Sequence, residues 1–183
     1  MIKQLSLAIK IPASTKQAIV EQLRSLNSEY RVFQWFPSEE YSIELFNFGK
    51  VDESKIEQLC EMIERGIFDM PSFKLYSENL SLIMRNNLTV YAGFQTSQLM
   101  QRLVKQLKQS FKIEDDMIFF PHLPVARYKI PSKQQYLLIK KKCASYKMEF
   151  EIDITQITLF NSVIENNKLR YETVKEFALF SKN

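Results

Sequence analysis

A small group of side chains in this sequence could carry out chemistry. His122 is the only histidine, and Arg127 follows it in the strand-like segment 119–130. Ser42 and Glu44 lie two residues apart in another strand-like segment, so their side chains would face the same side of a sheet. A carboxylate and an imidazole can act as general base and general acid, and a guanidinium can bind an anion through its fork of donors. These residue types indicate acid–base chemistry on an anionic substrate.

The composition excludes several other kinds of site. The chain has only three glycines, and they are too far apart to form a Walker-type phosphate loop or a G-x-G-x-x-G dinucleotide-binding turn. One histidine and two distant cysteines cannot build a zinc site unless carboxylates supply most of the ligands. The residue types needed for a Ser-His-Asp triad around His122 are present, but no G-x-S-x-G nucleophile elbow supports such a triad. We therefore expect no metal and no cofactor.

Two segments of the chain resemble the signatures of a known family. Residues 121–127 read PHLPVAR, and residues 42–49, downstream of Trp35, read SIELFNFG. They are similar to the signatures P-H-L-T-L-A-R and H-L-T-L-x-F-L-G of the two-histidine (2H) phosphoesterase superfamily, which includes the LigT-like RNA 2',3'-cyclic phosphodiesterases and 2'-5' RNA ligases. Weaker agreement extends over nearly the whole chain.

The resemblance implies a metal-independent mechanism. In the family, each motif places an imidazole and a hydroxyl side by side on one face of a strand. One imidazole deprotonates the attacking water, the other protonates the departing ribose oxygen, and the hydroxyls hold the non-bridging oxygens. For this chain, the resemblance implies that His122 is the second catalytic histidine and that Arg127 is a phosphate ligand.

The departures from the family pattern bear directly on activity. Ser42 stands where the family has its first histidine, Glu44 where it has the first threonine, and Pro124 where it has the second threonine. A single histidine makes the two-histidine mechanism impossible, and loss of a general acid or base costs about 10² to 10⁴ in rate. The sequence therefore predicts a degenerate family member, a pseudoenzyme that binds RNA ends or nucleotides with weak or no catalysis.

Other functions fit the same residues. In one, the chain is a residual cyclic phosphodiesterase with Glu44 as base and His122 as acid, acting on a 2',3'-cyclic or 2'-5'-linked phosphodiester. An ionised Glu44 would repel the phosphate unless Arg127 offsets its charge. In another, the chain keeps only the fold and binds a protein partner. A third interpretation is an unrelated α+β domain.

Each candidate residue also has a purely structural interpretation. His122 lies between two prolines and could be a surface histidine, and Arg127 could simply pair with a carboxylate. We predict that Trp35 and Phe48 stack on bases, as aromatic residues do in proteins that bind single-stranded nucleic acid. The alternative is core packing, because most aromatic side chains in a chain with 14 phenylalanines must be buried.

Hydrophobic periodicity and capping signals predict the elements that would position these residues. Two S-x-x-Q capping boxes, Ser14 with Gln17 and Ser132 with Gln135, are expected to begin helices. Another helix should begin at Asp52 and stop at Gly66. The remaining expected elements are strands at 3–11, in the segment 32–49 with its end near Gly49, and at 73–84, 87–94, 119–130, 148–160 and 169–180, and a helix at 97–111.

A strand-helix-strand-helix pattern thus occurs twice and predicts an α+β fold. We expect a single bilobal domain over residues 1–183, with two pseudo-symmetric lobes, each an antiparallel sheet backed by helices, and a cleft between them. Ser42 and His122 should lie on central strands and face each other across this cleft. Because proline cannot donate to a strand ladder, Pro124 should lie at a sheet edge, at a bulge or toward the cleft.

Composition limits partners and location. The chain is 45% hydrophobic and 25% charged with a net charge of +4, which permits a polyanionic partner such as RNA without requiring one. Gln4 and Lys10 interrupt any secretion signal, and no run of about 18 to 20 apolar residues could span a bilayer. Cys60 and Cys143 are expected to be buried thiols, which suits a reducing cytoplasm. We expect a cytoplasmic monomer with no membrane partner.

Overall fold

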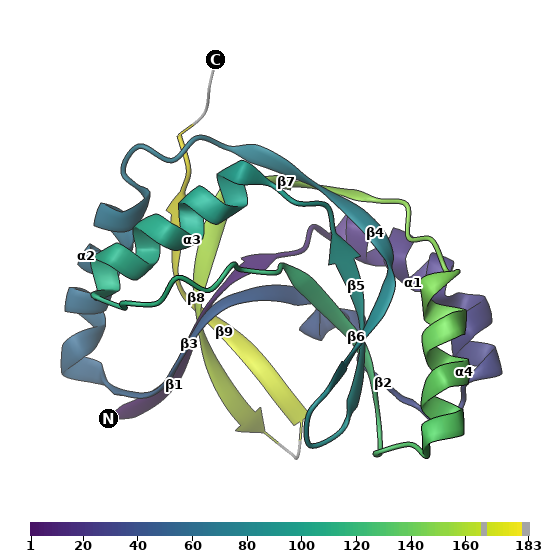
Figure 1. Cartoon of the computed structure of the whole chain (residues 1–183). Helices are drawn as coiled ribbons and strands as arrows, with labels where there is room; N and C mark the ends of the chain where they lie inside the picture. Colours follow the sequence, from purple (N-terminus) through teal and green to yellow (C-terminus); the bar gives the residue numbers. More distant parts are fainter. Residues whose placement is uncertain (166–167, 181–183) are drawn as a thin grey trace.

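The computed structural model describes residues 1–165 and 168–180 (Figure 1). These residues form two antiparallel sheets and four α-helices, so the predicted α+β architecture is confirmed. The elements are β1 (Ile2–Lys10), α1 (Ala13–Glu29), β2 (Gln34–Trp35), β3 (Ser42–Asp52), α2 (Ile56–Ile67), β4 (Phe73–Met84), β5 (Leu88–Phe94), α3 (Gln98–Phe111), β6 (His122–Tyr128), α4 (Lys133–Ala144), β7 (Glu151–Ile154), β8 (Gln156–Glu165) and β9 (Lys168–Ala178), with 3₁₀ turns at Ser38–Glu40 and Glu53–Lys55.

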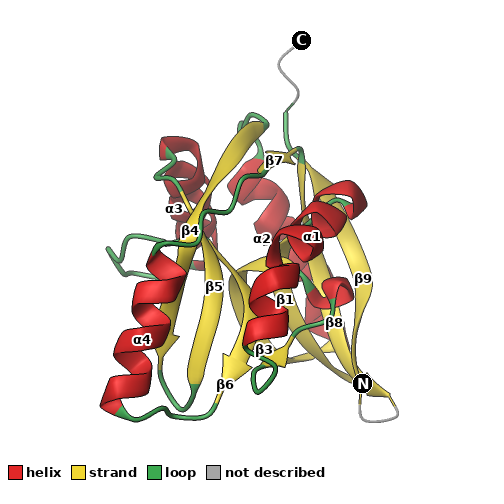
Figure 2. Cartoon of the chain, turned by 90° about the vertical axis from the view of Figure 1, so that its right-hand side faces the viewer, coloured by secondary structure: helices red, strands yellow, loops and turns green. Residues whose placement is uncertain are grey.

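The two lobes do not correspond to the two halves of the sequence. One sheet has the strand order β3-β1-β8-β9, and the other has the order β2-β6-β5-β4-β7. The first sheet therefore combines strands from both ends of the chain. Helices α2 and α3 pack against each other beside the first sheet, whereas α1 and α4 lie alongside the second (Figures 1 and 2). α1 follows β1 of the first sheet but lies beside the second sheet, and α3 follows β5 of the second sheet but lies beside the first. The repeated sequence pattern did not indicate this exchange of helices.

The helix signals in the sequence were partly correct. Ser132 and Gln135 form the predicted capping box of α4, and the Ser97 hydroxyl caps α3 by accepting from the Met100 N–H at 3.2 Å. The capping box at Ser14 was wrong. Helix α1 begins at Ala13 with Pro12 as its flanking residue, so Ser14 lies inside the first turn and its side chain makes no cap.

Two other predicted boundaries of helix α2 need correction. Asp52 accepts from the Ser54 N–H at 3.0 Å, but it begins a 3₁₀ turn, and α2 itself starts at Ile56. Gly66 does not stop the helix, which continues to Ile67. A Cβ atom at Gly66 would lie only 3.0 Å from Leu107 Cδ2 of α3. The glycine therefore permits the close approach of two helices instead of ending one.

The expected strand at 148–160 is split between the two sheets. β7 pairs with β4 in one sheet, and β8 pairs with β1 and β9 in the other. Residue Thr155 lies at the crossing, where its carbonyl accepts from the Leu179 N–H at 2.8 Å. β7 and β8 each have one buried, apolar side, so the sequence pattern alone predicts a single continuous strand.

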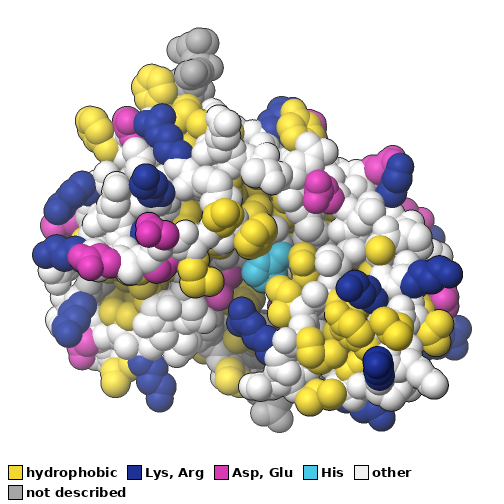
Figure 3. Space-filling model, in the orientation of Figure 1, with side chains coloured by type: hydrophobic (Ala, Val, Ile, Leu, Met, Phe, Trp, Pro, Cys, Tyr) yellow, Lys and Arg dark blue, Asp and Glu magenta, His cyan; other side chains and the backbone are white. Residues whose placement is uncertain are grey.

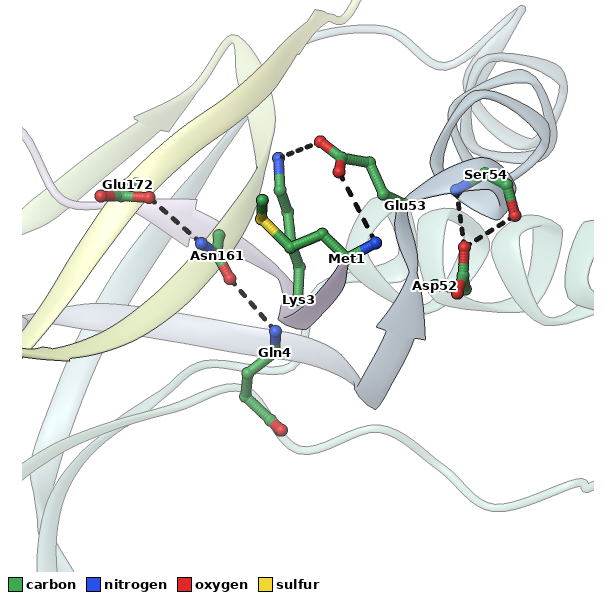
Figure 4. Close-up of polar contacts among 8 residues, drawn as sticks. All are labelled: Met1, Lys3, Gln4, Asp52, Glu53, Ser54, Asn161 and Glu172. Carbon is green, nitrogen blue, oxygen red and sulfur yellow. Dashed lines mark hydrogen bonds and ion pairs between the residues drawn. The ribbon is translucent and has the colours of Figure 1, made fainter.

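Side-chain contacts link neighbouring strands of the first sheet (Figure 4). The Gln4 N–H on β1 donates to the Asn161 side-chain oxygen at 3.1 Å, and the Asn161 amide donates to Glu172 of β9 at 3.1 Å. Lys3 pairs with Glu53 at 3.2 Å, next to the end of β3. β3 pairs with β1 from Ile2 opposite Asp52 to Lys10 opposite Ser42, with two bulges between these ends.

The hydrophobic core is continuous between the sheets and helices, and Cys60 and Cys143 are both free and buried, as predicted. Among the helices that the structure describes, none is both long enough and apolar enough to cross a membrane.

Candidate functional site

A large open cleft lies between the two sheets, with a volume of about 1270 Å³. Ser42 and Glu44 line it from β3, and His122 and Arg127 line it from β6, so the structure brings together the residues that the sequence singled out. Figure 3 shows the single histidine in the hollowed middle of this face. The expectation of central strands was wrong for Ser42, because β3 is an edge strand of its sheet. That edge contacts β6.

A bulge in β6 places His122 and Arg127 on the same face. Residues separated by five positions point to opposite faces of a regular strand. Here Pro124 lies opposite Tyr91 and Ala126 lies opposite Val90, so one extra residue is inserted between them. The insertion reverses the alternation and turns Arg127 toward the cleft. The bulge also confirms the expectation for the position of Pro124.

A second bulge in β3 separates the polar residues from the aromatic ones. Glu44 pairs with Ala8 and Phe46 pairs with Leu7, which leaves Leu45 as the extra residue. Beyond it, the rings of Phe46 and Phe48 lie 5.0 and 5.2 Å from the ring of Phe111 on α3. The structure therefore does not bring Phe48 to the cleft, and base stacking by Phe48 is not proposed further.

The environment of His122 defines its hydrogen-bonding capacity. Nδ1 lies 2.9 Å from the carbonyl oxygen of Phe120. Because a carbonyl only accepts, Nδ1 carries the hydrogen in this contact, and Nε2 is then an acceptor in the neutral ring and a donor in the imidazolium. The Tyr91 ring packs edge-on against the imidazole, with ring centroids 5.4 Å apart. The half-buried imidazole is thus held at two sides and has one nitrogen for a ligand.

Arg127 is oriented by an aromatic ring and not by a carboxylate. Its guanidinium carbon lies 5.4 Å from the centroid of the Phe36 ring, a cation–π contact. The Phe36 N–H donates to the carbonyl of Val125 at 3.0 Å, which fixes Phe36 beside the bulge. Within residues 1–165 and 168–180, Arg127 makes no ion pair. Its donors therefore remain available to an anion in the cleft.

Two residues that the sequence analysis missed also line the cleft. Burial raises the pKa of Glu40, the neighbouring Glu39 raises it further, and Arg127 lowers it. Burial likewise raises the pKa of Tyr171, and the charges of Glu40 and Glu44 add to the shift. The charges of Glu40 and Arg127 therefore act on each other, and the charge of Glu40 acts on the Tyr171 phenol, so these three groups are electrostatically coupled. The acidic turn before β3 was a signal for Glu40, but none pointed to Tyr171 on β9.

Arginines and a threonine complete the polar lining. Thr89 lies directly opposite Arg127 in the β5–β6 register and lines the same cleft. Arg85 and Arg170 line it from the two hairpin ends, β4–β5 and β8–β9. A hydroxyl and several guanidinium groups therefore face the same space as His122. Such donors suit the oxygens of a phosphate.

Trp35 lines the cleft as predicted, but its polar atom is occupied. The indole N–H donates to the carbonyl of Tyr30 at 3.1 Å, and the ring packs against Phe33 at 6.2 Å between centroids. The half-buried ring can therefore offer only its apolar surface to a ligand.

The donor set fits acid–base chemistry without a metal. Over the described ranges, no group of three or more histidine, cysteine, aspartate or glutamate side chains could hold a metal ion. An imidazole, carboxylates and a guanidinium in one cleft can bind a phosphodiester and move protons at its ester oxygens.

Comparisons with known proteins identify the fold. An RNA 2',3'-cyclic phosphodiesterase from Thermotoga maritima is 24% identical over 140 residues, which are 72% of this chain and 74% of that protein. The crystal structure of Escherichia coli LigT without ligand has a TM-score of 0.77 at 21% identity, covering 97% of this chain and 98% of LigT. Its complex with 3'-AMP has a TM-score of 0.75 at 20% identity, with 98% and 99% covered. LigT has also been solved with ATP and with NADP+.

A protein of Thermus thermophilus matches with a TM-score of 0.74 at 16% identity, over 98% of this chain and all of that one. No protein-family model matches the chain. The resemblance that the motifs indicated is nevertheless confirmed. This chain is similar in sequence to a cyclic phosphodiesterase and has the fold of LigT and related phosphoesterases over nearly its whole length.

Proposed function

We propose that this chain, which has the LigT fold, binds RNA ends or nucleotides through a 2',3'-cyclic or 2'-5'-linked phosphodiester, with weak or no catalysis. One observation carries this proposal: His122 and Arg127 on one sheet face Ser42 and Glu44 on the other across a single cleft. The nucleotides found with LigT support the choice of ligand class. Arg127 is the principal phosphate ligand, and the Nε2 atom of His122 supplies a further contact.

The residues at the motif positions argue for binding over turnover. Ser42 cannot replace an imidazole, because an effective general acid or base has a pKa near the working pH and a serine hydroxyl ionises only far above it. Pro124 supplies neither a hydroxyl nor an N–H to a phosphate oxygen. Glu44 and Glu40 bring negative charge toward an anionic ligand. These losses remove catalytic groups while the Arg127 site is retained.

A second function has a specific observation in its favour. Glu44 and His122 approach the cleft from opposite sheets, the arrangement that a base and an acid on either side of a phosphorus atom require. In this alternative the chain is a residual phosphodiesterase, in which Glu44 takes a proton from water and His122 gives one to the leaving ribose oxygen. Tyr171 and Thr89 would then offer hydroxyls in place of the absent threonines.

Binding and turnover of a nucleoside 2',3'-cyclic phosphate separate the two functions. A binder gives a calorimetric binding isotherm and no ring-opened product. Glu44→Gln should then tighten binding, because the exposed carboxylate that repels the phosphate is neutralised. Glu61→Gln is the matched control, since Glu61 is exposed on α2 and lies outside the cleft. Absence of any binding by the wild-type protein would contradict the proposal.

The residual enzyme gives a different pattern. Its rate should be bell-shaped in pH, since one group must be ionised while the other is protonated. Glu44→Gln and His122→Ala should each lower the rate by about 10² or more, with the double variant little worse than either, because both groups act in one step. Wild-type turnover that disappears in Glu44→Gln would establish this alternative.

The proposal includes a cytoplasmic monomer. The free, buried thiols of Cys60 and Cys143 support a reducing compartment. Sedimentation of the purified protein tests the monomer. A stable complex with another protein that leaves the cleft unable to bind nucleotides would instead favour a partner-binding role.

A further inference from the structure

We propose that a second hollow beside His122 is a nucleobase subsite, which holds the base of the nucleotide whose phosphodiester lies against His122 and Arg127. This inference rests on the proposed function and specifies its ligand. The hollow, called the side pocket below, has a volume of about 680 Å³. That size falls within the range of about 300 to 1,000 Å³ typical of small-molecule sites. Its lining includes Asn79, Ser81, Tyr91, Gly93, Gln95 and Phe120.

The side pocket is contiguous with the catalytic position. Tyr91 lines it and packs against the His122 ring at 5.4 Å between centroids. Phe120 also lines it, and its carbonyl accepts from His122 Nδ1 at 2.9 Å. Gly93 lies directly opposite His122 in the β5–β6 register. Because Gly93 has no side chain, its backbone and the Tyr91 ring form the surface between the imidazole and the pocket. A ribose with its phosphate at His122 can therefore extend its base into the side pocket.

Phe120 offers an aromatic surface for stacking. Phe120 lines the side pocket and is 73% exposed, so one face of its ring is free to contact a base. It is exposed but anchored. The Gln101 side-chain amide donates to the Phe119 carbonyl at 2.6 Å, and its oxygen accepts from the Phe119 N–H at 3.1 Å. This double contact fixes the backbone before Phe120, so little ordering is required when a planar base covers the ring.

The charges of the side pocket differ from those of the main cleft. The main cleft is lined by three arginines and three glutamates, whose charges balance, whereas the charged residues of the side pocket are two glutamates and one lysine: Glu78, Glu149 and Lys147. A net negative lining disfavours a phosphate and accepts a neutral base. Neutral groups for hydrogen bonding are present. Gln95 and Ser81 are exposed, and the Asn79 amide nitrogen donates to the Ala144 carbonyl at 2.8 Å, which leaves its oxygen as an acceptor.

The test compares two ligands that differ only in the base. One is adenosine 2',3'-cyclic phosphate, and the other is the same cyclic phosphate on a ribose that carries a methoxy group in place of adenine. Wild-type protein should bind the adenosine compound more tightly. Phe120→Ala should weaken its binding by about 5- to 100-fold, the effect of losing one base–aromatic contact, and leave the base-free ligand unchanged. Phe68→Ala is the matched control, because Phe68 is 88% exposed and lies outside both hollows.

A second variant adds a side chain to the surface beside His122. A Cβ atom at Gly93 would lie 3.5 Å from the Asn79 carbonyl oxygen and 3.9 Å from Tyr91, which are ordinary contacts. Gly93→Val should therefore fold, and β-branched residues suit a strand. Its side chain should again weaken adenosine binding and spare the base-free ligand. Thermal unfolding verifies that both variants are folded.

The outcomes distinguish the subsite from the phosphate site. Equal affinity of the wild-type protein for the two ligands would overturn the nucleobase subsite and leave the proposed function standing. Equal losses for both ligands in Phe120→Ala or Gly93→Val would also overturn it, since a base contact cannot affect a ligand without a base. Failure of the wild-type protein to bind either ligand would overturn both proposals.

Discussion

Removal of the Arg127 guanidinium tests the phosphate site most directly. In the free protein this side chain is exposed and stacks on Phe36, so its charge is already hydrated. Two unit charges 4 Å apart interact by about 1 kcal/mol in water and about 4 kcal/mol at an effective dielectric constant of 20. A hydrogen bond to a charged group contributes about 1.5 to 3 kcal/mol. For an exposed donor we expect the lower end, and 1.4 kcal/mol corresponds to a tenfold change in affinity.

Arg127→Ala should therefore weaken binding of a nucleoside 2',3'-cyclic phosphate by about tenfold, measured by isothermal titration calorimetry. Arg127→Lys should recover part of the loss, because lysine keeps the charge but not the planar fork of donors. The difference between wild type and Arg127→Ala should shrink as salt is added, since exposed charges are screened.

Arg65→Ala provides the control for a general loss of positive charge, because Arg65 is exposed on α2 and does not line the cleft. Folded Arg127→Ala protein that binds within a factor of two of the wild type would refute the assignment of Arg127. An equal loss in Arg65→Ala would do the same, because it would show that net charge alone governs affinity.

Three further predictions concern the fold and its ionisable groups. Gly66→Ala should lower the free energy of unfolding, measured by urea denaturation, by about 1 kcal/mol. Overpacking against Leu107 costs about 1 to 3 kcal/mol, whereas the higher helix propensity of alanine stabilises the helix by about 1 kcal/mol. A variant more stable than the wild type would contradict this prediction. Burial raises the pKa of Cys143 to about 11, so thiol reagents at pH 8 should label it only on unfolding, and rapid labelling of native protein would disprove its burial. The raised pKa of Glu40 means that its ionised form disfavours folding, and this penalty appears as pH rises through that pKa. Glu40→Gln should accordingly raise Tm at neutral pH and lose its advantage in acid, whereas a pH-independent gain would exclude the electrostatic explanation.

Elements with strong local signals could be predicted from the sequence. The β4–β5 hairpin is marked by alternating apolar residues around an Asn-Asn turn, and α3 has a complete apolar stripe behind the Ser97 cap. The capping box at Ser132 was correct, but the same pattern at Ser14 was not. At Ser14 the rigid backbone of Pro12 already defines the helix start, so the signal in the side chains had no role there.

Long-range pairing decided what the sequence could not show. β1 lies between β3 and β8, which leaves β3 at the edge of the sheet. This order depends on pairing between segments that are far apart in the sequence. Phe48 packs against α3 because β3 has two bulges, one at Leu45 and one at Phe48 itself, which break the alternation that the sequence indicated. Tyr171 comes from near the C-terminal end, and only the β8–β9 register brings it to the cleft. Four site residues were found from motifs, whereas their neighbours required the register.

The bulge in β6 accounts for the tolerance of a proline at residue 124. A regular strand would present His122 and Arg127 on opposite faces, so the extra residue is needed for both to reach one ligand. At a bulge the hydrogen-bonded ladder is already interrupted, and a proline there removes a donor at little cost to the sheet. A proline is therefore compatible with the fold at this position, and Arg127 reaches the cleft although residue 124 has no hydroxyl.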